Sequence, residues 1–270
     1  MTGILSIQFN PKIGDKEFNL NKVEEFISQN SDKNLDLVLF PEFFSTGIDH
    51  NSFLNFPEDE EGGKTIKRIQ EIAKNFNTNI VVGSVIEKSE NKLYNTSFAI
   101  NRTGKIIAKY RKIHLFDYNG GTESQRITAG HKPILAKFDF GKVGLNICYD
   151  FRYPLMQKKL VKMGAEILVC PTAWCIPNEN YNTPDKLKHE LGIWQSLNKI
   201  RAYDNLVYVA SCNQVGKVNN RVSNIGYSMI VSPDGEILAN AKDKECSLYA
   251  NIDLDIVKKY KKDYPIANIN

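Results

Sequence analysis

The 270-residue sequence lacks the signatures of several classes of protein. Its five cysteines include no C-x-x-C pair, which argues against a structural zinc site and against a disulfide scaffold. No apolar run approaches the roughly 20 residues that a membrane span needs. The N-terminal segment contains neither a basic stretch nor a signal-peptide cleavage site. We therefore expect a cytoplasmic protein with no membrane partner.

The sequence also has little that would attract nucleic acid. Its net charge is only +4, and its one dense basic run, at residues 258–262, goes with no RNA- or DNA-binding motif. We interpret that run as the charged end of a helix and expect no nucleic-acid partner. No Ser/Gly-rich linker or change of composition divides the chain, so residues 1–270 are expected to form a single domain.

Apolar patterns predict an α/β fold. Runs of strand length alternate with segments of helical spacing, and hairpin turns join several of the strands, which implies a mixed sheet with helices on the outside. The predicted strands are residues 4–9, 35–40, 80–86, 93–100, 105–110, 134–140, 142–147, 166–171, 205–211, 225–231, 236–240 and 247–252. The predicted helices are residues 20–27, 62–77, 155–163 and 185–203, and polar loops are predicted at residues 117–130 and 176–184.

Cys148 occupies the most informative position in the chain. It ends the apolar run that begins at Lys142, and a helical pattern resumes at Leu155. Backbone N–H groups of such a turn, together with the helix dipole, favour a thiolate and any oxyanion formed beside it. By itself this stretch leaves two readings open, because most single cysteines are small buried hydrophobic residues rather than nucleophiles.

Glu42 and Lys112 also follow predicted strands. A carboxylate beside Phe43 and Phe44 can have a raised pKa, which suits a base that later acts as an acid. A lysine ammonium can lower the pKa of a thiol and neutralise a developing oxyanion. The alternatives are that Glu42 caps a helix and that Lys112 is one of many surface lysines.

Three segments resemble the signature segments of the nitrilase superfamily of carbon–nitrogen hydrolases, and they occur in the family's order. They are Pro-Glu-Phe at residues 41–43, Tyr-Arg-Lys-Ile-His-Leu-Phe at 110–116 and Gly-Leu-Asn-Ile-Cys-Tyr-Asp-Phe-Arg at 144–152. The similarity extends over nearly the whole chain and includes residues 201–205 and 226–235. One such segment would be weak evidence, but three in order strongly favour catalysis at Cys148.

The resemblance implies a four-layer α-β-β-α sandwich with mixed sheets and outer helices, usually paired into a homodimer or larger homo-oligomer. Glu42 matches the family's general base, Lys112 its oxyanion-stabilising lysine and Cys148 its nucleophile. The family's second glutamate, which positions the substrate and supports the lysine, is best matched by Glu123, although the loop after Phe116 is short here. No metal or organic cofactor is implied.

The implied reaction is hydrolysis of a small amide through a thioester, which releases ammonia and a carboxylic acid. The backbone N–H of Tyr149 is expected to help hold the oxyanion. Asp150 and Arg152 resemble the amidase branches that act on small carboxylate-bearing amides, whereas true nitrilase branches tend to read Cys-Trp-Glu there. We therefore predict an amidase that resembles ω-amidase. Trp174 follows a predicted strand and either lines the pocket or packs the loop, and Cys175 beside it could be a redox-sensitive neighbour.

Other functions remain open at this stage. Within the superfamily, the chain could be an N-carbamoyl amidohydrolase or a nitrilase, while N-acyltransfer usually goes with membrane spans that this sequence lacks. A Cys–His hydrolase would use His114 or His189 as base and Asn213 to orient it. A non-catalytic binding or scaffold protein of the same fold would have no reason to keep Glu42, Lys112 and Cys148 together.

Overall fold

The computed structural model describes residues 1–60, 63–118 and 121–264 of the chain. Its larger sheet is mixed: β1, β2 and β3 run parallel, and β16 and β5 run antiparallel to their neighbours. In spatial order the strands are β16 (Cys246–Ile252), β1 (Thr2–Gln8), β2 (Leu37–Leu39), β3 (Asn79–Val81), β5 (Lys92–Ile100) and β4 (Val85–Ser89), with β6 (Ile106–Arg111) also paired to β5.

The second sheet is also mixed, with β8, β9 and β11 parallel at its centre. Its strands are β15 (Ile237–Asn240), β14 (Met229–Val231), β11 (Tyr208–Asn213), β9 (Ile167–Thr172), β8 (Lys142–Leu145) and β7 (Leu135–Lys137). A small antiparallel sheet is built from β10 (Cys175–Pro177), β13 (Val222–Ile225) and β12 (Val215–Lys217).

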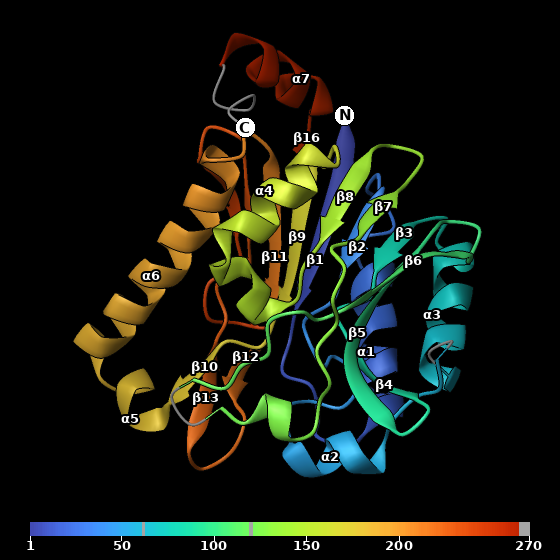
Figure 1. The fold of residues 1–270 in the computed structure, drawn as a ribbon, viewed down its shortest axis with the longest axis vertical. Coiled ribbons are helices and arrows are strands. Elements are labelled where there is room, and N and C mark those ends of the chain that lie inside the picture. The colour runs from blue at the N-terminus through green and yellow to red at the C-terminus, as the bar shows by residue number, and fades with distance from the viewer. Residues whose placement is uncertain (61–62, 119–120, 265–270) are drawn as a thin grey trace.

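The two large sheets pack face to face between two layers of helices (Figure 1). Cross-sheet contacts join β1 and β11, where Ser6 Oγ donates to Ser211 O at 3.1 Å and Cys212 Sγ donates to Ile7 O at 3.0 Å. Strand alternation separates two cores, because Leu37 and Leu39 face the other sheet while Val38 faces the helices. The predicted four-layer sandwich is confirmed.

Amphipathic helices cover the outer faces of the sheets. α1 (Lys16–Ser28) and α3 (Gly63–Asn75) pack on the first sheet, and α4 (Pro154–Lys162) and α6 (Pro184–Tyr203) pack on the second. The shorter helices are α2 (His50–Asn55), α5 (Asn178–Tyr181) and α7 (Leu254–Asp263), with 3-10 turns η1 (Glu123–Gln125) and η2 (Cys148–Arg152). None of the helices in the described part of the chain is long and apolar enough to cross a bilayer.

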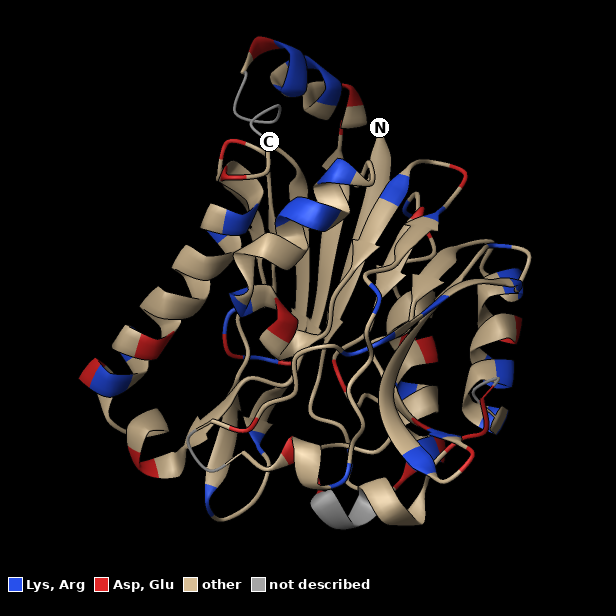
Figure 2. Ribbon diagram, in the orientation of Figure 1, with Lys and Arg blue, Asp and Glu red and all other residues tan. Residues whose placement is uncertain are grey.

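Charged residues lie mainly on the helices and connecting loops, while the strands are largely free of charge (Figure 2). The basic run at residues 258–262 belongs to α7, as predicted from its helical character. Val257 anchors this helix by its buried side chain.

Two predicted strands are each divided in two. Residues 80–86 form the end of β3 and the start of β4, because the chain bends at Gly83, where an added Cβ would lie 1.9 Å from Pro41 O. Residues 225–231 are interrupted between β13 and β14, where Gly226 and Tyr227 have φ values of 74° and 55°. The predicted loop at 176–184 contains α5 and part of β10. Gly62 of the predicted helix and residues 119–120 of the predicted loop lie outside the described residues.

Candidate active site

The predicted catalytic residues converge at one end of the sandwich. Glu42 follows β2, Lys112 directly follows β6, and Cys148 is the first residue of η2, shortly after β8. β2 and β6 point to the same end of their sheet, because β2 runs parallel to β3, β5 runs antiparallel to β3, and β6 runs antiparallel to β5. Ligands of open α/β sheets bind beyond the carboxyl ends of parallel strands, which explains why residues so far apart in the chain meet here.

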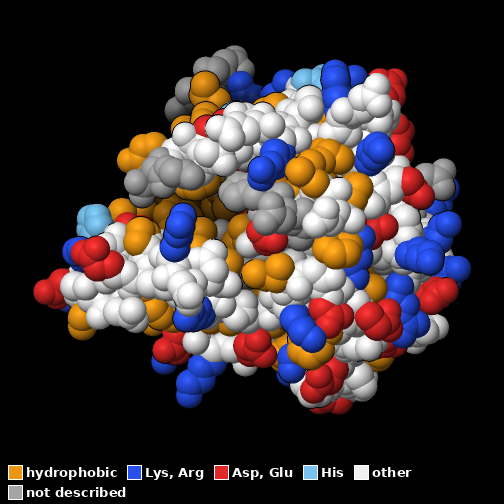
Figure 3. Space-filling view, turned by 90° about the horizontal axis from the view of Figure 1, so that it is seen from below, with side chains coloured by type: hydrophobic (Ala, Val, Ile, Leu, Met, Phe, Trp, Pro, Cys, Tyr) orange, Lys and Arg blue, Asp and Glu red, His pale blue; other side chains and the backbone are white. Residues whose placement is uncertain are grey.

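A pocket of about 320 Å³ contains these residues. Figure 3 shows a hollow lined with hydrophobic side chains on the face that carries α2 and the small sheet. The pocket is lined by Glu42, Phe43, Ile48, Asp49, Phe53, Lys112, Phe116, Gly121, Thr122, Glu123, Cys148, Tyr149, Arg152, Ala173, Trp174, Cys175, Pro177, Val218, Asn219 and Val222. All seven residues predicted to act in catalysis or binding are among them.

Lys112 links the two glutamates. Its Nζ lies 2.9 Å from Glu42 Oε1 and 2.8 Å from Glu123 Oε2, and its side chain is only 2% exposed. Glu123 Oε2 also accepts the backbone N–H of Phe116 at 2.8 Å. The loop that was short in the sequence therefore still delivers its glutamate to the lysine.

Burial and neighbouring charges shift the pKa values of this cluster. Burial, helped by the negative charge of Glu123, raises the pKa of Glu42 against the opposing effect of Lys112. Burial alone would lower the pKa of Lys112, but Glu123 and Glu42 raise it well above its usual value, so the ammonium is retained. Burial and the charge of Glu42 raise the pKa of Cys148 well above its usual value, so its resting state is the thiol. Attack by this thiol therefore requires a base.

The backbone around the site is strained at two positions. Cys148 has φ of 46° and Phe43 has φ of 52°, in the left-handed region that side chains other than glycine rarely occupy. Such residues cost about 1–3 kcal/mol each and persist only where the surroundings hold them. Phe43 is held by a hydrogen bond from its N–H to Ser84 Oγ at 2.9 Å. The left-handed conformation of Cys148 lies at the start of η2, where the chain leaves the extended conformation of Ile147.

Asp150 holds the turn that carries Cys148. Its buried carboxylate accepts hydrogen bonds from Ile147 N at 3.0 Å, from Tyr110 Oη at 2.6 Å and from His114 N at 2.9 Å. It thus ties the turn after β8 to the chain on either side of Lys112. The Asp150 carboxylate is outside the set of residues that line the pocket, so its position in the motif reflects support of the backbone rather than contact with a substrate.

The geometry does not favour a Cys–His hydrolase. His114 Nδ1 lies 2.8 Å from Asp150, and its ring stacks on Tyr153 at 3.5 Å between centroids. Asn213 accepts the N–H of Trp174 and donates to Gly226 O. Neither residue lines the described part of the pocket, and nor does His189, which belongs to a groove along α6.

The remaining predicted residues form the pocket wall. Trp174 lines the pocket and also packs edge-on against buried Trp194, with 5.4 Å between ring centroids. It therefore has both of the roles that the sequence offered as alternatives, as part of the pocket wall and as a packing residue. Arg152 lies 5.6 Å from the ring of Tyr149. Burial raises the pKa of Cys175 to about 11, which keeps this thiol protonated and argues against ready oxidation.

Asn95 of β5 is the contact that sequence reasoning missed. Its Nδ2 donates to Glu42 Oε1 at 2.9 Å and to Glu123 Oε1 at 3.0 Å. Asn95 stands beside Thr96 and Ser97 in the strand, so no signal in the sequence singled it out, and only the register of β5 brings it into contact with the site. Among the described residues, no group of three or more His, Cys, Asp or Glu side chains is placed to hold a metal ion.

Comparison with known proteins identifies the family of the chain. Residues 4–262 match the family model described as carbon-nitrogen hydrolase. The chain is 32% identical to the 2-oxoglutaramate amidase of Bacillus subtilis over 97% of this chain and 95% of that protein. It is 30% identical to the omega-amidase NIT3 of Saccharomyces cerevisiae over 97% of this chain and 90% of that protein.

The fold has close structural counterparts. The crystal structure of Saccharomyces cerevisiae Nit3, described as a member of branch 10 of the nitrilase superfamily, matches with a TM-score of 0.85 at 28% identity. That match covers 98% of this chain and 94% of the other. The chain therefore belongs to the carbon-nitrogen hydrolase family of the nitrilase superfamily and is a carbon–nitrogen hydrolase.

Proposed function

We propose that this hydrolase is an amidase that uses Cys148 as nucleophile and Glu42 as general base. The observation that carries the proposal is a neutral, partly exposed thiol near a lysine ammonium that is shared by two glutamates in a small pocket. Glu42 takes the proton of Cys148 as the sulfur attacks the amide carbon. The thiol's raised pKa makes this transfer necessary.

The two glutamates are proposed to have different roles because their oxygens have different partners. Both oxygens of Glu123 accept hydrogen bonds, Oε1 from Asn95 and Oε2 from Lys112 and Phe116. On Glu42, Asn95 and Lys112 both bind Oε1. Glu42 thus keeps Oε2 available for a proton, while Glu123 supports the lysine.

The oxyanion of the tetrahedral intermediate is proposed to bind the Lys112 ammonium and the backbone N–H of Tyr149. Protonated Glu42 then gives its proton to the leaving nitrogen, and the C–N bond breaks to release ammonia and leave a thioester. A water molecule that loses a proton to Glu42 attacks the thioester, and Glu42 returns that proton to the sulfur as the acid leaves. Atoms and charge balance with no further reagent.

Ammonia release from a panel of small amides, nitriles and N-carbamoyl compounds tests the reaction class. We expect turnover of amides that is abolished by Cys148→Ala while the fold is retained, with Cys175→Ala as the matched control in the same pocket. Ammonia from nitriles but not from amides would overturn the amidase assignment, and release only from N-carbamoyl compounds would favour that branch. A folded protein with no turnover of any class would support the non-catalytic alternative.

The substrate is proposed to be a small amide that carries a carboxylate, as with ω-amidases. Arg152 lies at the wall of the pocket with its guanidinium near the rings of Tyr149 and Tyr118, and no acidic side chain among the described residues pairs with it. A guanidinium without an ion-pair partner is well suited to bind a carboxylate in two-pronged geometry. The two relatives named above, an omega-amidase and a 2-oxoglutaramate amidase, agree with this substrate class.

Arg152→Met tests this assignment. We expect KM for a dicarboxylic acid monoamide to rise about tenfold or more, in line with loss of a charge-assisted hydrogen bond. The matched control is a neutral amide of the same length, whose kcat/KM should be unchanged by the substitution. An equal loss on both substrates would show that Arg152 does not recognise a carboxylate.

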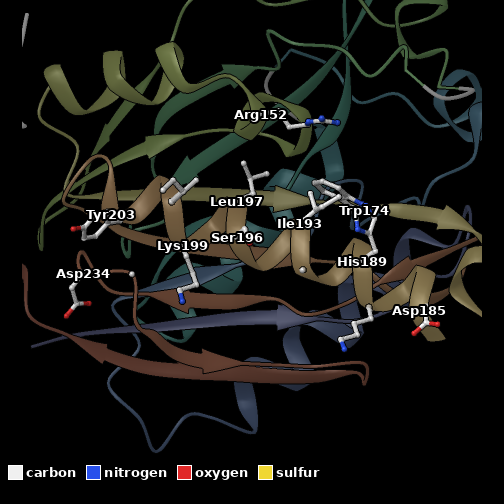
Figure 4. A pocket seen from close by; sticks show the side chains of 14 residues that line it. Arg152, Trp174, Asp185, His189, Ile193, Ser196, Leu197, Lys199, Tyr203 and Asp234 are labelled. Carbon is white, nitrogen blue, oxygen red and sulfur yellow. The ribbon is translucent and has the colours of Figure 1, made fainter. Parts of the chain in front are cut away.

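We also propose that the chain forms a homodimer through α6. A groove of about 1100 Å³ runs along this helix (Figure 4), and Ile193, Ile200 and Tyr203 are exposed there at 41%, 43% and 55%. Gly192 has open space around it, so another helix could approach closely. Asp185 and Lys199 lie seven residues either side of Gly192. An antiparallel two-fold pair would therefore place opposite charges together.

The dimer is tested by sedimentation of charge variants. We expect Asp185→Lys and Lys199→Asp each to weaken association, and the double variant to restore it, because only the swapped pair recovers both contacts of the two-fold axis. A monomeric wild type at micromolar concentration would contradict the proposed interface, as would an unchanged assembly in Gly192→Glu.

A further inference from the structure

Asn95 contacts three of the four proposed catalytic residues, namely Glu42, Glu123 and Lys112. The Asn95 side chain is fully buried on β5 and its Nδ2 donates to both glutamates. Its backbone carbonyl accepts the N–H of Lys112 at 2.9 Å. We propose that Asn95 is a positioning residue that orients Glu42 and Glu123 around the lysine and leaves one oxygen of Glu42 available for the thiol proton. This inference rests on the proposed role of Glu42 as base.

The orientation of the amide follows from its surroundings. Each of the two N–H bonds of Nδ2 has one carboxylate oxygen to bind, whereas the reverse orientation would place an amide oxygen against two carboxylates. The present orientation leaves buried Oδ1 without a hydrogen-bond partner. Because an unpaired buried oxygen is unfavourable, we infer that the two hydrogen bonds donated by Nδ2 are the contacts that the site requires.

Asn95 also decides where on Glu42 the proton goes. Because Asn95 and Lys112 both bind Oε1 of Glu42, that oxygen is saturated by donors. Among the described residues no hydrogen bond occupies Oε2. Loss of Asn95 would let the carboxylate rotate about its Cγ–Cδ bond and share its oxygens between the lysine and the thiol.

The ionisation of Glu42 depends on the same contact. Burial and the nearby Glu123 raise the pKa of Glu42, while hydrogen bonds from Lys112 and Asn95 lower it. Removing the Asn95 donor should therefore raise the pKa further, and a larger share of the enzyme would hold a protonated base near neutral pH. A merely structural asparagine would not produce this effect.

The decisive experiment compares the pH dependence of Asn95→Leu, Asn95→Ser and wild type. One readout is kcat/KM on the best amide of the panel, and the other is alkylation of Cys148 by iodoacetamide, followed by mass spectrometry of its peptide. We expect Asn95→Leu to lower kcat/KM about 100-fold, as loss of one preorganised donor does. The acidic limb of both profiles should move up by about one pH unit. Asn95→Ser keeps one donor hydrogen and should lie between.

Asn198→Leu is the matched control. Asn198 is equally buried, its Nδ2 donates to Trp194 O at 2.9 Å, and its Oδ1 is also unpaired, but it lies on α6 away from the glutamates. Its substitution should reduce stability without moving the acidic limb. An unmoved limb in Asn95→Ser and Asn95→Leu, with a stability loss like that of the control, would overturn the inference.

The alkylation profile separates this inference from the proposed function. If Glu42→Gln abolishes the acidic limb but the Asn95 variants leave it in place, Glu42 remains the base and only the role of Asn95 is wrong. If Glu42→Gln leaves the limb unchanged, Glu42 is not the base, and both proposals fail. Asn95→Ser decides the matter should Asn95→Leu not fold.

Discussion

Two ionic clusters with buried carboxylates flank strand β6, and the pKa values of these carboxylates are shifted in opposite directions. Alternation along the strand turns Lys109 and Arg111 to the outer face, where they bind Glu87 at 2.9 Å and 2.5 Å. Lys112 turns to the inner face, where it binds Glu42 and Glu123. Yet the pKa of Glu87 is lowered although burial opposes it, whereas the pKa of Glu42 is raised.

The difference lies in the balance of charges and in access to water. Glu87 alone receives two cations and the hydroxyl of Thr96, and those cations are about 30% exposed and remain hydrated. Glu42 shares a single cation with Glu123 in a site that water barely reaches. A surplus of donors makes a stable anion, while a shortage makes a base that readily takes a proton. Chemistry and structural support are thus separated across one strand.

The sharpest test of this comparison removes each of two adjacent cations in turn, one from each cluster. Lys112→Met should lower kcat by about 1000-fold or more through loss of oxyanion stabilisation, and should destabilise the fold by about 3–5 kcal/mol because two glutamates lose their buried partner. Arg111→Met should change kcat only a few-fold. Steady-state kinetics and urea unfolding measure both effects. Comparable losses of activity in the two variants would erase the distinction between the clusters.

The carboxylates should respond in opposite ways. Glu42→Gln should lower kcat about 1000-fold, as loss of a general base does, while thermal stability stays equal or rises because a poorly compensated charge leaves the interior. Glu87→Gln should keep activity but lower the free energy of unfolding by about 1–3 kcal/mol, since Arg111 and Lys109 lose their acceptor. A less stable Glu42→Gln protein with normal turnover would contradict the role of the inner cluster.

The pH dependence of stability should have opposite signs for the two groups. The pKa of Glu87 is lower in the folded state, so its contribution is present above the unfolded value near 4.5 and is lost as pH falls through the folded pKa. The pKa of Glu42 is higher in the folded state, so its contribution is present below 4.5 and is lost as pH rises through the folded pKa. Urea unfolding of wild type, Glu42→Gln and Glu87→Gln from pH 3 to 8, a range of about five units, measures both. Parallel stability curves for the three proteins would refute the assignment.

The smallest expected effect concerns His114. Its ring supports Asp150 and does not line the pocket, so His114→Ala should lower kcat about five- to tenfold, equivalent to the roughly 1 kcal/mol that one hydrogen bond contributes. Kinetics beside Lys112→Met provide the comparison. A loss at His114 larger than that at Lys112 would revive the Cys–His alternative.

Much of the fold and site was readable from the sequence because the signals are local. Apolar runs marked the strands, and the position of Cys148 after one such run marked the turn of the nucleophile. The predicted strands that proved to be divided are those in which backbone from a distant part of the sequence lies against a glycine. The bend at Gly83 exists because Pro41 O lies against it, and no periodicity within residues 80–86 records that contact. The resemblance of three segments supplied the roles that periodicity could not.

The sequence by itself determined which residues stand at the ends of strands and, through their order, the family of the chain. Tertiary structure decided what each does there. It placed Asn95 against two glutamates, turned the Asp150 carboxylate away from the pocket, and set Glu42 and Glu87 in surroundings of opposite effect. The physical reason is that strand position depends on local apolar pattern, whereas pKa and hydrogen bonding depend on neighbours that only sheet register and packing bring together.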